Sequence, residues 1–340
     1  MRVLFLCAAL LLGHAAYAAD ADPVLLAAAQ KEGQVVWYST LIVNQILRPL
    51  AEAFEQKYPG VRVQYSRSTN SDVALKIINE SRARRLQADI FDGTNSIYPL
   101  LDAKLVAAYP PKAAASYPAE SRDSDGYWTA MNLFFLTAGY NTNQVKPADV
   151  PRSYEDLLDP KWKGKIAWTN DPTPQGPPGF IHNILTIMGP EKGMAYLRTF
   201  AAQEPVFIPA SQRVVLDKVI SGEYPLAVMT FNHHAAISAA QGAPVAWIRM
   251  EPLSESINLI GILKDAPHPN AARLLEEFIL SDDGQRVLAD NDYIPASPSV
   301  PAKMADLKPD AGHFKVNVVT PEMARDDLPK WTAIYKELFR

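Results

Sequence analysis

The sequence predicts an α/β fold in which two lobes, each with a central mixed or parallel sheet, are joined by a hinge. The chain has 340 residues, which is more than one hydrophobic core usually supports, so two domains are expected. Short β-type runs alternate with helical patterns in two separate stretches, 35–96 and 165–252. This alternation predicts right-handed βαβ units and a sheet that helices cover on both faces.

The first stretch predicts three strands separated by two helices. The first helix is indicated by apolar residues that recur on one face: Leu47, Leu50, Phe54 and Tyr58. Pro49 is compatible with this helix only in or near the first turn. A second helix is expected from about 72 to 85. The strands are expected at 35–38, 61–65 and 88–91.

The second stretch repeats the pattern, with strands expected at 166–168, 224–229 and 245–248. Helices are expected at 180–188 and 191–202, and a third helix is expected to begin near Ser211 and to end by Ser221. The C-terminal part predicts a helix-rich stretch over 269–289 and an amphipathic helix over 331–339.

Two apolar, β-like segments, 128–140 and 258–263, lie between the two stretches and are expected to be the crossing strands of a hinge. The predicted division places 20–133 and 259–305 in lobe 1, and 134–258 and 306–340 in lobe 2.

The N-terminal segment predicts export. Arg2 is followed by an apolar run, Val3 to Leu12, and then by small residues that end at Ala18 and Ala19. This pattern is typical of a cleavable signal peptide, and the run is too short to cross a bilayer as a helix of the mature protein. We therefore expect residues 1–19 to be a signal peptide and the mature protein to be soluble in the periplasm.

The composition is that of an ordinary globular protein, with 48% hydrophobic residues, 21% charged residues and a net charge of -4. Mild acidity without a long basic run argues against nucleic acid as a partner. The single cysteine, Cys7, lies in the leader, so no disulfide or thiolate metal site is expected in the mature chain. The sequence also has no Gly-x-Ser-x-Gly motif and no histidines at metal-binding spacing, so a secreted metal-dependent hydrolase is the weaker alternative.

Polar loops follow the predicted strands at the edge where α/β sheets bind ligands. In the first stretch these loops contain small hydroxyl and amide side chains: Ser39, Thr40, Ser68, Thr69, Thr94 and Asn95. Helix capping is the ordinary role of such residues. The convergence of three loops on one edge favours a polar ligand site, because the N–H groups that need caps can also hold an anion.

The loop 170–179 of the second stretch is a further candidate. Backbone and side-chain donors are expected from Thr173, Gln175 and Gly176, although Pro177 and Pro178 remove two backbone donors. Asn170 and Asp171 of the same loop are further candidate ligand-binding residues. A rigid turn between domains is the alternative. Arg213, at the start of a predicted helix, could pair with a carboxylate or phosphate, and its alternative role is that of an exposed surface arginine.

Asn232, His233 and His234 follow the strand expected at 224–229. The two histidines could border the cleft and bond to backbone, contact an anion through imidazole N–H groups, or bind a metal. A metal needs further ligands, and neighbouring residues point in different directions in most backbones. We therefore expect no metal and no cofactor.

Several segments resemble a known family: 140–143, 151–166, 170–173, 221–227 and 274–285. They are similar to type 2 periplasmic solute-binding proteins of ABC importers, in the ferric-iron-binding-protein-like branch. Iron-binding members of that branch hold Fe(III) through adjacent tyrosines, and the matching positions here are His233 and His234. Phenolate suits ferric iron, whereas imidazole suits zinc, copper or nickel better.

The resemblance implies a binding protein without enzymatic activity, expected to be a monomer. Its partners would be a small-molecule solute, held between closing lobes, and the transmembrane subunits of an ABC permease. A small organic solute that carries an oxyanion is the expected cargo. Ferric iron held with a synergistic anion is the alternative cargo, and a periplasmic sensor accessory is an alternative role.

Overall fold

The computed structural model describes residues 21–339. The predicted signal peptide, residues 1–19, lies outside the described residues. Among the described helices, none combines the length and hydrophobicity needed to cross a membrane.

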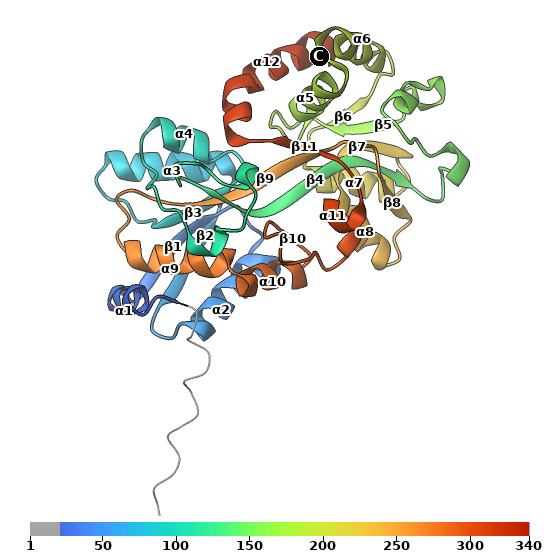
Figure 1. Ribbon diagram of the computed structural model, residues 1–340. Coiled ribbons are helices and arrows are strands. Elements are labelled where there is room, and N and C mark those ends of the chain that lie inside the picture. Colours follow the sequence, from blue (N-terminus) through green and yellow to red (C-terminus); the bar gives the residue numbers. More distant parts are fainter. Residues whose placement is uncertain (1–20, 340) are drawn as a thin grey trace, which may run out of the picture.

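One continuous mixed sheet forms the centre of the molecule, with the main strand order β2-β1-β3-β9-β4-β7-β5-β6 (Figure 1). The strands at both ends of this order are parallel, and those in the middle are antiparallel. The predicted α/β fold class with mixed sheets is confirmed. The strands are β1 (Gln34–Ser39), β2 (Arg62–Arg67), β3 (Ile90–Gly93), β4 (Thr129–Asn141), β5 (Ile166–Thr169), β6 (Val206–Ile208), β7 (Leu226–Phe231), β8 (Val245–Ile248), β9 (Leu253–Ile262), β10 (Ile294–Pro295) and β11 (Val316–Val319).

Lobe 1 is the part of the molecule around β1, β2 and β3. On one face of this sheet lie α1 (Pro23–Glu32), α2 (Arg48–Lys57), α9 (Pro269–Leu280) and α10 (Asp282–Asp290), and on the other lie α3 (Asn70–Arg82) and α4 (Ile97–Asp102) (Figure 1). The helix α2 buries Leu50 and Phe54, and Phe54 packs edge-on against Phe278 at 5.7 Å between ring centroids. Pro49 lies in its first turn, as predicted.

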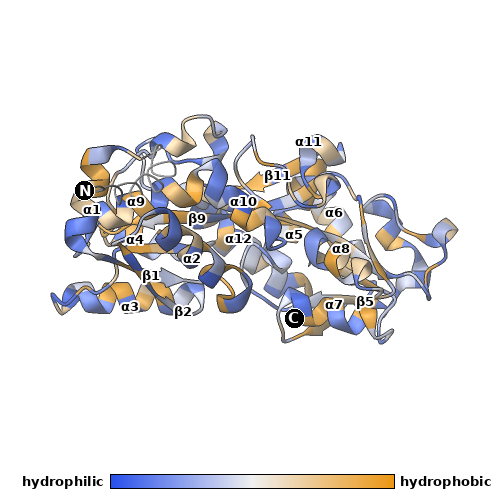
Figure 2. Ribbon diagram, turned by 90° about the horizontal axis from the view of Figure 1, so that it is seen from below, coloured by the Kyte–Doolittle hydropathy of each residue, from blue (hydrophilic) through white to orange (hydrophobic). Residues whose placement is uncertain are grey.

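Lobe 2 is the part around β5, β6 and β7. The helices α5 (Pro177–Met188), α6 (Pro190–Ala201) and α12 (Pro321–Phe339) cover one face, and α7 (Gln212–Ile220) and α8 (Asn232–Ala240) cover the other (Figure 1). The helices carry both hydrophobic and hydrophilic residues, as expected for helices with one buried face (Figure 2).

The C-terminal helix corrects the sequence prediction. The sequence predicts a helix over 331–339, but α12 begins at Pro321 and continues through Pro329. Proline inside a helical pattern normally marks a boundary, and here packing overrides that preference. Phe339 and Tyr335 anchor the helix in the core of lobe 2, where the Phe339 ring lies 5.5 Å from the ring of Trp168.

The hinge strands β4 and β9 run antiparallel between the two cores, paired from Thr129 with Ile260 to Leu136 with Ser254. The lobe 1 end of β4 contributes Ala130 and Phe135 to the core of lobe 1, and Leu136 begins its contribution to lobe 2. The two segments expected to cross between the lobes are therefore strands. The residue boundaries of the lobes stay a prediction.

A buried glutamine ties α10 to the hinge. Gln285 is fully buried, and its Nε2 donates to the carbonyls of Met131 and Ile279 at 3.0 and 2.9 Å. Its Oε1 accepts from the Ser297 N–H at 2.9 Å. All three partners are backbone groups of different segments, so this one side chain fixes their relative positions.

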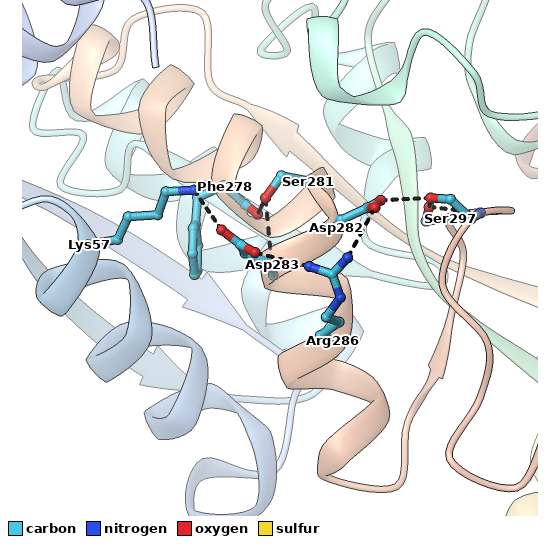
Figure 3. A network of polar contacts seen from close by, with 9 residues as sticks. Lys57, Phe278, Ser281, Asp282, Asp283, Arg286 and Ser297 are labelled. Atoms are coloured by element: carbon cyan, nitrogen blue, oxygen red, sulfur yellow. Dashed lines mark hydrogen bonds and ion pairs between the residues drawn. The ribbon is translucent and has the colours of Figure 1, made fainter. Parts of the chain in front are cut away.

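Around the first turn of α10, charged side chains link the same region to its surroundings (Figure 3). Asp283 pairs with Lys57 of α2 at 2.7 Å, and Arg286 pairs with both Asp282 and Asp283. Asp282 also accepts from the Ser299 hydroxyl at 2.6 Å. The α10 N-terminus is thereby held against α2 and the segment that follows β10.

Candidate functional site

Two loops of lobe 1 are joined through a buried carboxylate. Both the N–H and the hydroxyl of Thr40 donate to Asp92 Oδ1, at 2.9 and 2.7 Å. Asp92 is fully buried and its Oδ2 has no partner. Burial raises the pKa of Asp92 to about 6, although the two hydrogen bonds from Thr40 act in the opposite direction.

A second contact joins the loops after β2 and β3. The Asn70 side chain accepts from the N–H groups of Thr94 and Asn95 at 2.8 and 3.1 Å. Gly93 makes this possible because its φ is +154°, and a Cβ there would lie 2.4 Å from Asn70 Oδ1. The predicted loop residues Thr40, Thr94 and Asn95 therefore belong to one hydrogen-bonded framework.

The other three predicted residues of lobe 1 have different roles. Thr69 is the N-cap of α3, and its hydroxyl accepts from the Asp72 N–H at 3.2 Å. Ser39 is fully buried, and its hydroxyl accepts from the Leu41 N–H. Ser68 is exposed and donates its N–H to the Ser39 carbonyl. The capping role is thus the observed one for Thr69.

The loop 170–179 does not supply the backbone donors expected from its sequence. Helix α5 begins at Pro177, three residues before the predicted start, so Pro177 and Pro178 occupy its first turn and carry no N–H. The remaining backbone N–H groups of 170–180 all donate to acceptors within the chain. The reason is local geometry: Asx and hydroxyl turns at Asp171 and Thr173 consume the N–H groups that would otherwise point outward.

Side chains of this loop nevertheless reach the hinge and α7. Gln175 Nε2 donates to the Ser256 hydroxyl of β9 at 3.4 Å. Gln212, at the start of α7, donates to Asp171 Oδ2 at 3.1 Å and to the Gln175 carbonyl at 3.0 Å. Asn170 donates its N–H to the Ile208 carbonyl at the end of β6.

His233 and His234 lie in the first turn of α8, where backbone N–H groups have no acceptor within the helix. His233 is 4% exposed, and its ring stacks on Phe134 of β4 at 5.9 Å. Neither Nδ1 atom has a partner. Burial lowers the pKa of His234 to about 4 and that of His233 well below its ordinary value, and the charge of Arg213 acts in the same direction. Both imidazoles are therefore neutral at pH 7.

The nearby cation is Arg213 in the first turn of α7. Its guanidinium donates to the Ser238 hydroxyl of α8 at 3.0 Å and pairs with Asp217 at 2.8 Å. The fully buried Asn232 completes this corner: its Nδ2 donates to the Leu307 carbonyl, and its Oδ1 has no partner. The corner combines a fixed positive charge with buried polar atoms that lack partners.

The comparison with known families decides what kind of protein carries these loops. Residues 80–322 match the family described as bacterial extracellular solute-binding protein. The chain belongs to this family. The solute-binding protein predicted from the sequence, and its likeness to the ferric-iron-binding-protein-like branch of the type 2 fold, are confirmed.

Three relatives of this solute-binding protein illustrate the range of its family. Iron uptake protein A1 of Synechocystis sp. is 26% identical over 65% of the chain, and the match spans 63% of that relative, which is less than two thirds of its length. A putative 2-aminoethylphosphonate-binding periplasmic protein of Salmonella paratyphi A is 23% identical over 81% of the chain and 79% of its own length. A Trichodesmium protein solved with iron and citrate ligands has a TM-score of 0.74 at 19% identity, covering 90% of this chain and 99% of that one.

Three residues that organise the solute-binding protein's loops are not among the predicted site residues. Asn70, Asp92 and Gln212 each connect two loops that were considered separately. The available signal was position, because each lies at a predicted strand end or helix start. Within residues 21–339, no group of three or more histidine, cysteine or acidic side chains is arranged to hold a metal ion.

Proposed function

We propose that this protein is the periplasmic component of an ABC importer, and that it binds a small organic solute carrying an oxyanion between its lobes. The observation that carries the choice of solute is the corner formed by Arg213, the neutral His233 and His234, and the α8 N-terminus. A fixed cation beside free N–H groups and unprotonated imidazoles favours an anion. The relative named for 2-aminoethylphosphonate supports the same class.

The affinity of such a site requires both lobes. An anion at a helix N-terminus gains about 0.3–1 kcal/mol, or up to ~2 kcal/mol when partly buried. A micromolar ligand needs ~8 kcal/mol. We therefore propose that the lobe 1 framework of Thr40, Thr94 and Asn95 closes on the same solute, and that the closed form docks on the permease subunits.

Ferric iron held with a synergistic anion is the second candidate, and the iron-related names of two relatives favour it. The two neutral imidazoles are poor ligands for ferric iron. Titration with ferric citrate separates the two candidates: retention of iron after gel filtration would favour the metal, and binding of citrate alone would favour the oxyanion.

The test of the proposed class is isothermal titration with phosphate, 2-aminoethylphosphonate and citrate. Arg213→Gln should weaken the probe that binds by tenfold or more, because the fixed charge is lost. Arg286→Gln is the matched control, since Arg286 is also paired with aspartates but lies on α10. Equal weakening by both variants, or no effect of Arg213→Gln, would contradict the site.

Export and a monomeric state belong to the same proposal. Cleavage after Ala18 or Ala19 predicts a periplasmic protein that starts at Ala19 or Asp20, and intact-mass measurement after expression with the leader checks this directly. Light scattering coupled to gel filtration checks the monomer. A smaller radius of gyration on probe binding, measured by small-angle X-ray scattering, checks closure.

A further inference from the structure

The hinge strands carry a pair of asparagines that is only half satisfied. Asn132 of β4 and Asn258 of β9 are register partners, and Asn258 Nδ2 donates to Asn132 Oδ1 at 2.9 Å. The remaining atoms, Asn132 Nδ2 and Asn258 Oδ1, have no partner. Turning both amides over would give the same result: one free NH2 group beside one free carbonyl oxygen. We call these two residues the hinge amide pair.

The free atoms are costly because the pair is buried. Asn132 is 0% exposed and Asn258 is 1% exposed. A buried donor or acceptor without a partner has lost its hydrogen bonds to water without replacement, which destabilises the folded state. An apolar pair would fill this position without that cost. The unpaired atoms therefore indicate a partner that is not part of the chain.

The face that carries the hinge amide pair is the one that meets the loops of lobe 2. Because side chains alternate along a strand, Phe134 shares a face with Asn132, and Ser256 shares a face with Asn258. Phe134 stacks on His233, and Ser256 accepts from Gln175. The opposite face is covered differently, since Phe135 packs against Phe314.

The loop after β3 in lobe 1 also lies near the hinge amide pair. Gly93 of β3 pairs with Leu259, the residue after Asn258. The next residue along the chain is Thr94, which is 8% exposed and whose hydroxyl is also buried without a partner. Unpaired polar atoms of both hinge strands and of the β3 loop thus gather where the two lobes meet.

We propose that the hinge amide pair binds a hydroxyl group of the solute. A hydroxyl donates to Asn258 Oδ1 and accepts from Asn132 Nδ2 at once, whereas a carboxylate only accepts and an ammonium only donates. Resting on the proposed function, this narrows the solute class to hydroxylated oxyanions, such as hydroxycarboxylates or sugar phosphates. The corner at Arg213 holds the anionic group, and the hinge amide pair selects for the hydroxyl.

The test uses probe pairs that differ by one hydroxyl: citrate with tricarballylate, malate with succinate, and glycerol 3-phosphate with n-propyl phosphate. Isothermal titration of the unaltered protein should show at least one hydroxylated probe binding tenfold or more tightly than its partner. In the double variant Asn132→Leu/Asn258→Leu the ratio should fall to about one. The ligand-free variant should unfold at the same temperature or higher, because both unpaired atoms are removed together.

The matched control is Asn317→Leu, which breaks a different asparagine pair, between Asn317 of β11 and Asn183 of α5, and should leave the hydroxyl preference unchanged. If the affinities of the two members of every probe pair that binds lie within twofold of each other, the hydroxyl assignment is overturned and the oxyanion proposal stands. Absence of binding by all six probes would overturn both. A double variant that keeps the hydroxyl preference but unfolds several degrees lower would show that the hinge amide pair stabilises the fold and does not bind the solute, and would overturn the assignment. The unaltered protein's ratios decide the question even if the double variant does not fold.

Discussion

Replacement of Asp92 by asparagine should stabilise the protein at neutral pH and not in acid. The carboxyl is fully buried, and burial raises its pKa from 3.8 to about 6. Because the folded pKa exceeds the unfolded one, the folded state binds this proton more tightly. The favourable contribution is fully present below about pH 4 and is lost as the pH rises through 6.

The magnitude follows from the size of the shift. A difference of about two pKa units corresponds to about 3 kcal/mol of free energy of unfolding. Asparagine keeps an Oδ1 that can accept from Thr40, and it removes the buried charge. The stability of Asp92→Asn minus that of the unaltered protein should therefore rise by about 3 kcal/mol between pH 4 and pH 7.5.

Urea unfolding followed by tryptophan fluorescence at several pH values measures this difference. Asp283→Asn is the control, because a hydrogen bond from Lys57 lowers the pKa of Asp283. The ionised Asp283 carboxylate contributes to stability above pH 3.8, and this contribution is lost only in stronger acid. The stability of Asp283→Asn minus that of the unaltered protein should therefore change little between pH 4 and pH 7.5. A flat or falling profile for Asp92→Asn would refute the reasoning.

Three further substitutions test the framework of the fold by urea unfolding. Gln285→Leu should lower the free energy of unfolding by about 3–5 kcal/mol, because three buried backbone groups lose their partners. The control Gln144→Leu, at an exposed position, should lower it by less than about 1 kcal/mol. Equal losses in the two variants would contradict the argument. Phe339→Ala should lose about 2 kcal/mol by leaving the Trp168 cluster incomplete, whereas a neutral effect would show that the end of α12 is not anchored. Gly176→Ala should lower the free energy of unfolding by about 2 kcal/mol or more, since a Cβ would lie 2.0 Å from the Asp171 carbonyl oxygen. Gly164→Ala, where a Cβ would enter open space but φ is +68°, should lower it by only about 1 kcal/mol.

The elements that the sequence predicted well are those whose pattern reflects local burial. In α2 the buried residues Leu50 and Phe54 recur at helical spacing, and the hinge strand β4 is buried along almost its whole length. Periodicity records which face of an element meets the core, and this requires no knowledge of the partner. The same argument predicted which loops follow the strands, because parallel strands place their carboxyl ends at one edge.

What those loops do was decided only by the tertiary structure. The backbone N–H groups of 170–180 have internal acceptors, which a list of donors along the sequence cannot reveal. Asp92 meets Thr40 across 52 positions of sequence, and Asn258 meets Asn132 across 126. A polar side chain that lacks a partner is defined by every neighbour it has, and those neighbours come from segments that approach one another only when the chain is folded. The sequence by itself therefore determined a solute-binding protein of α/β architecture, and the folded packing determined which of its polar groups remain free for a solute.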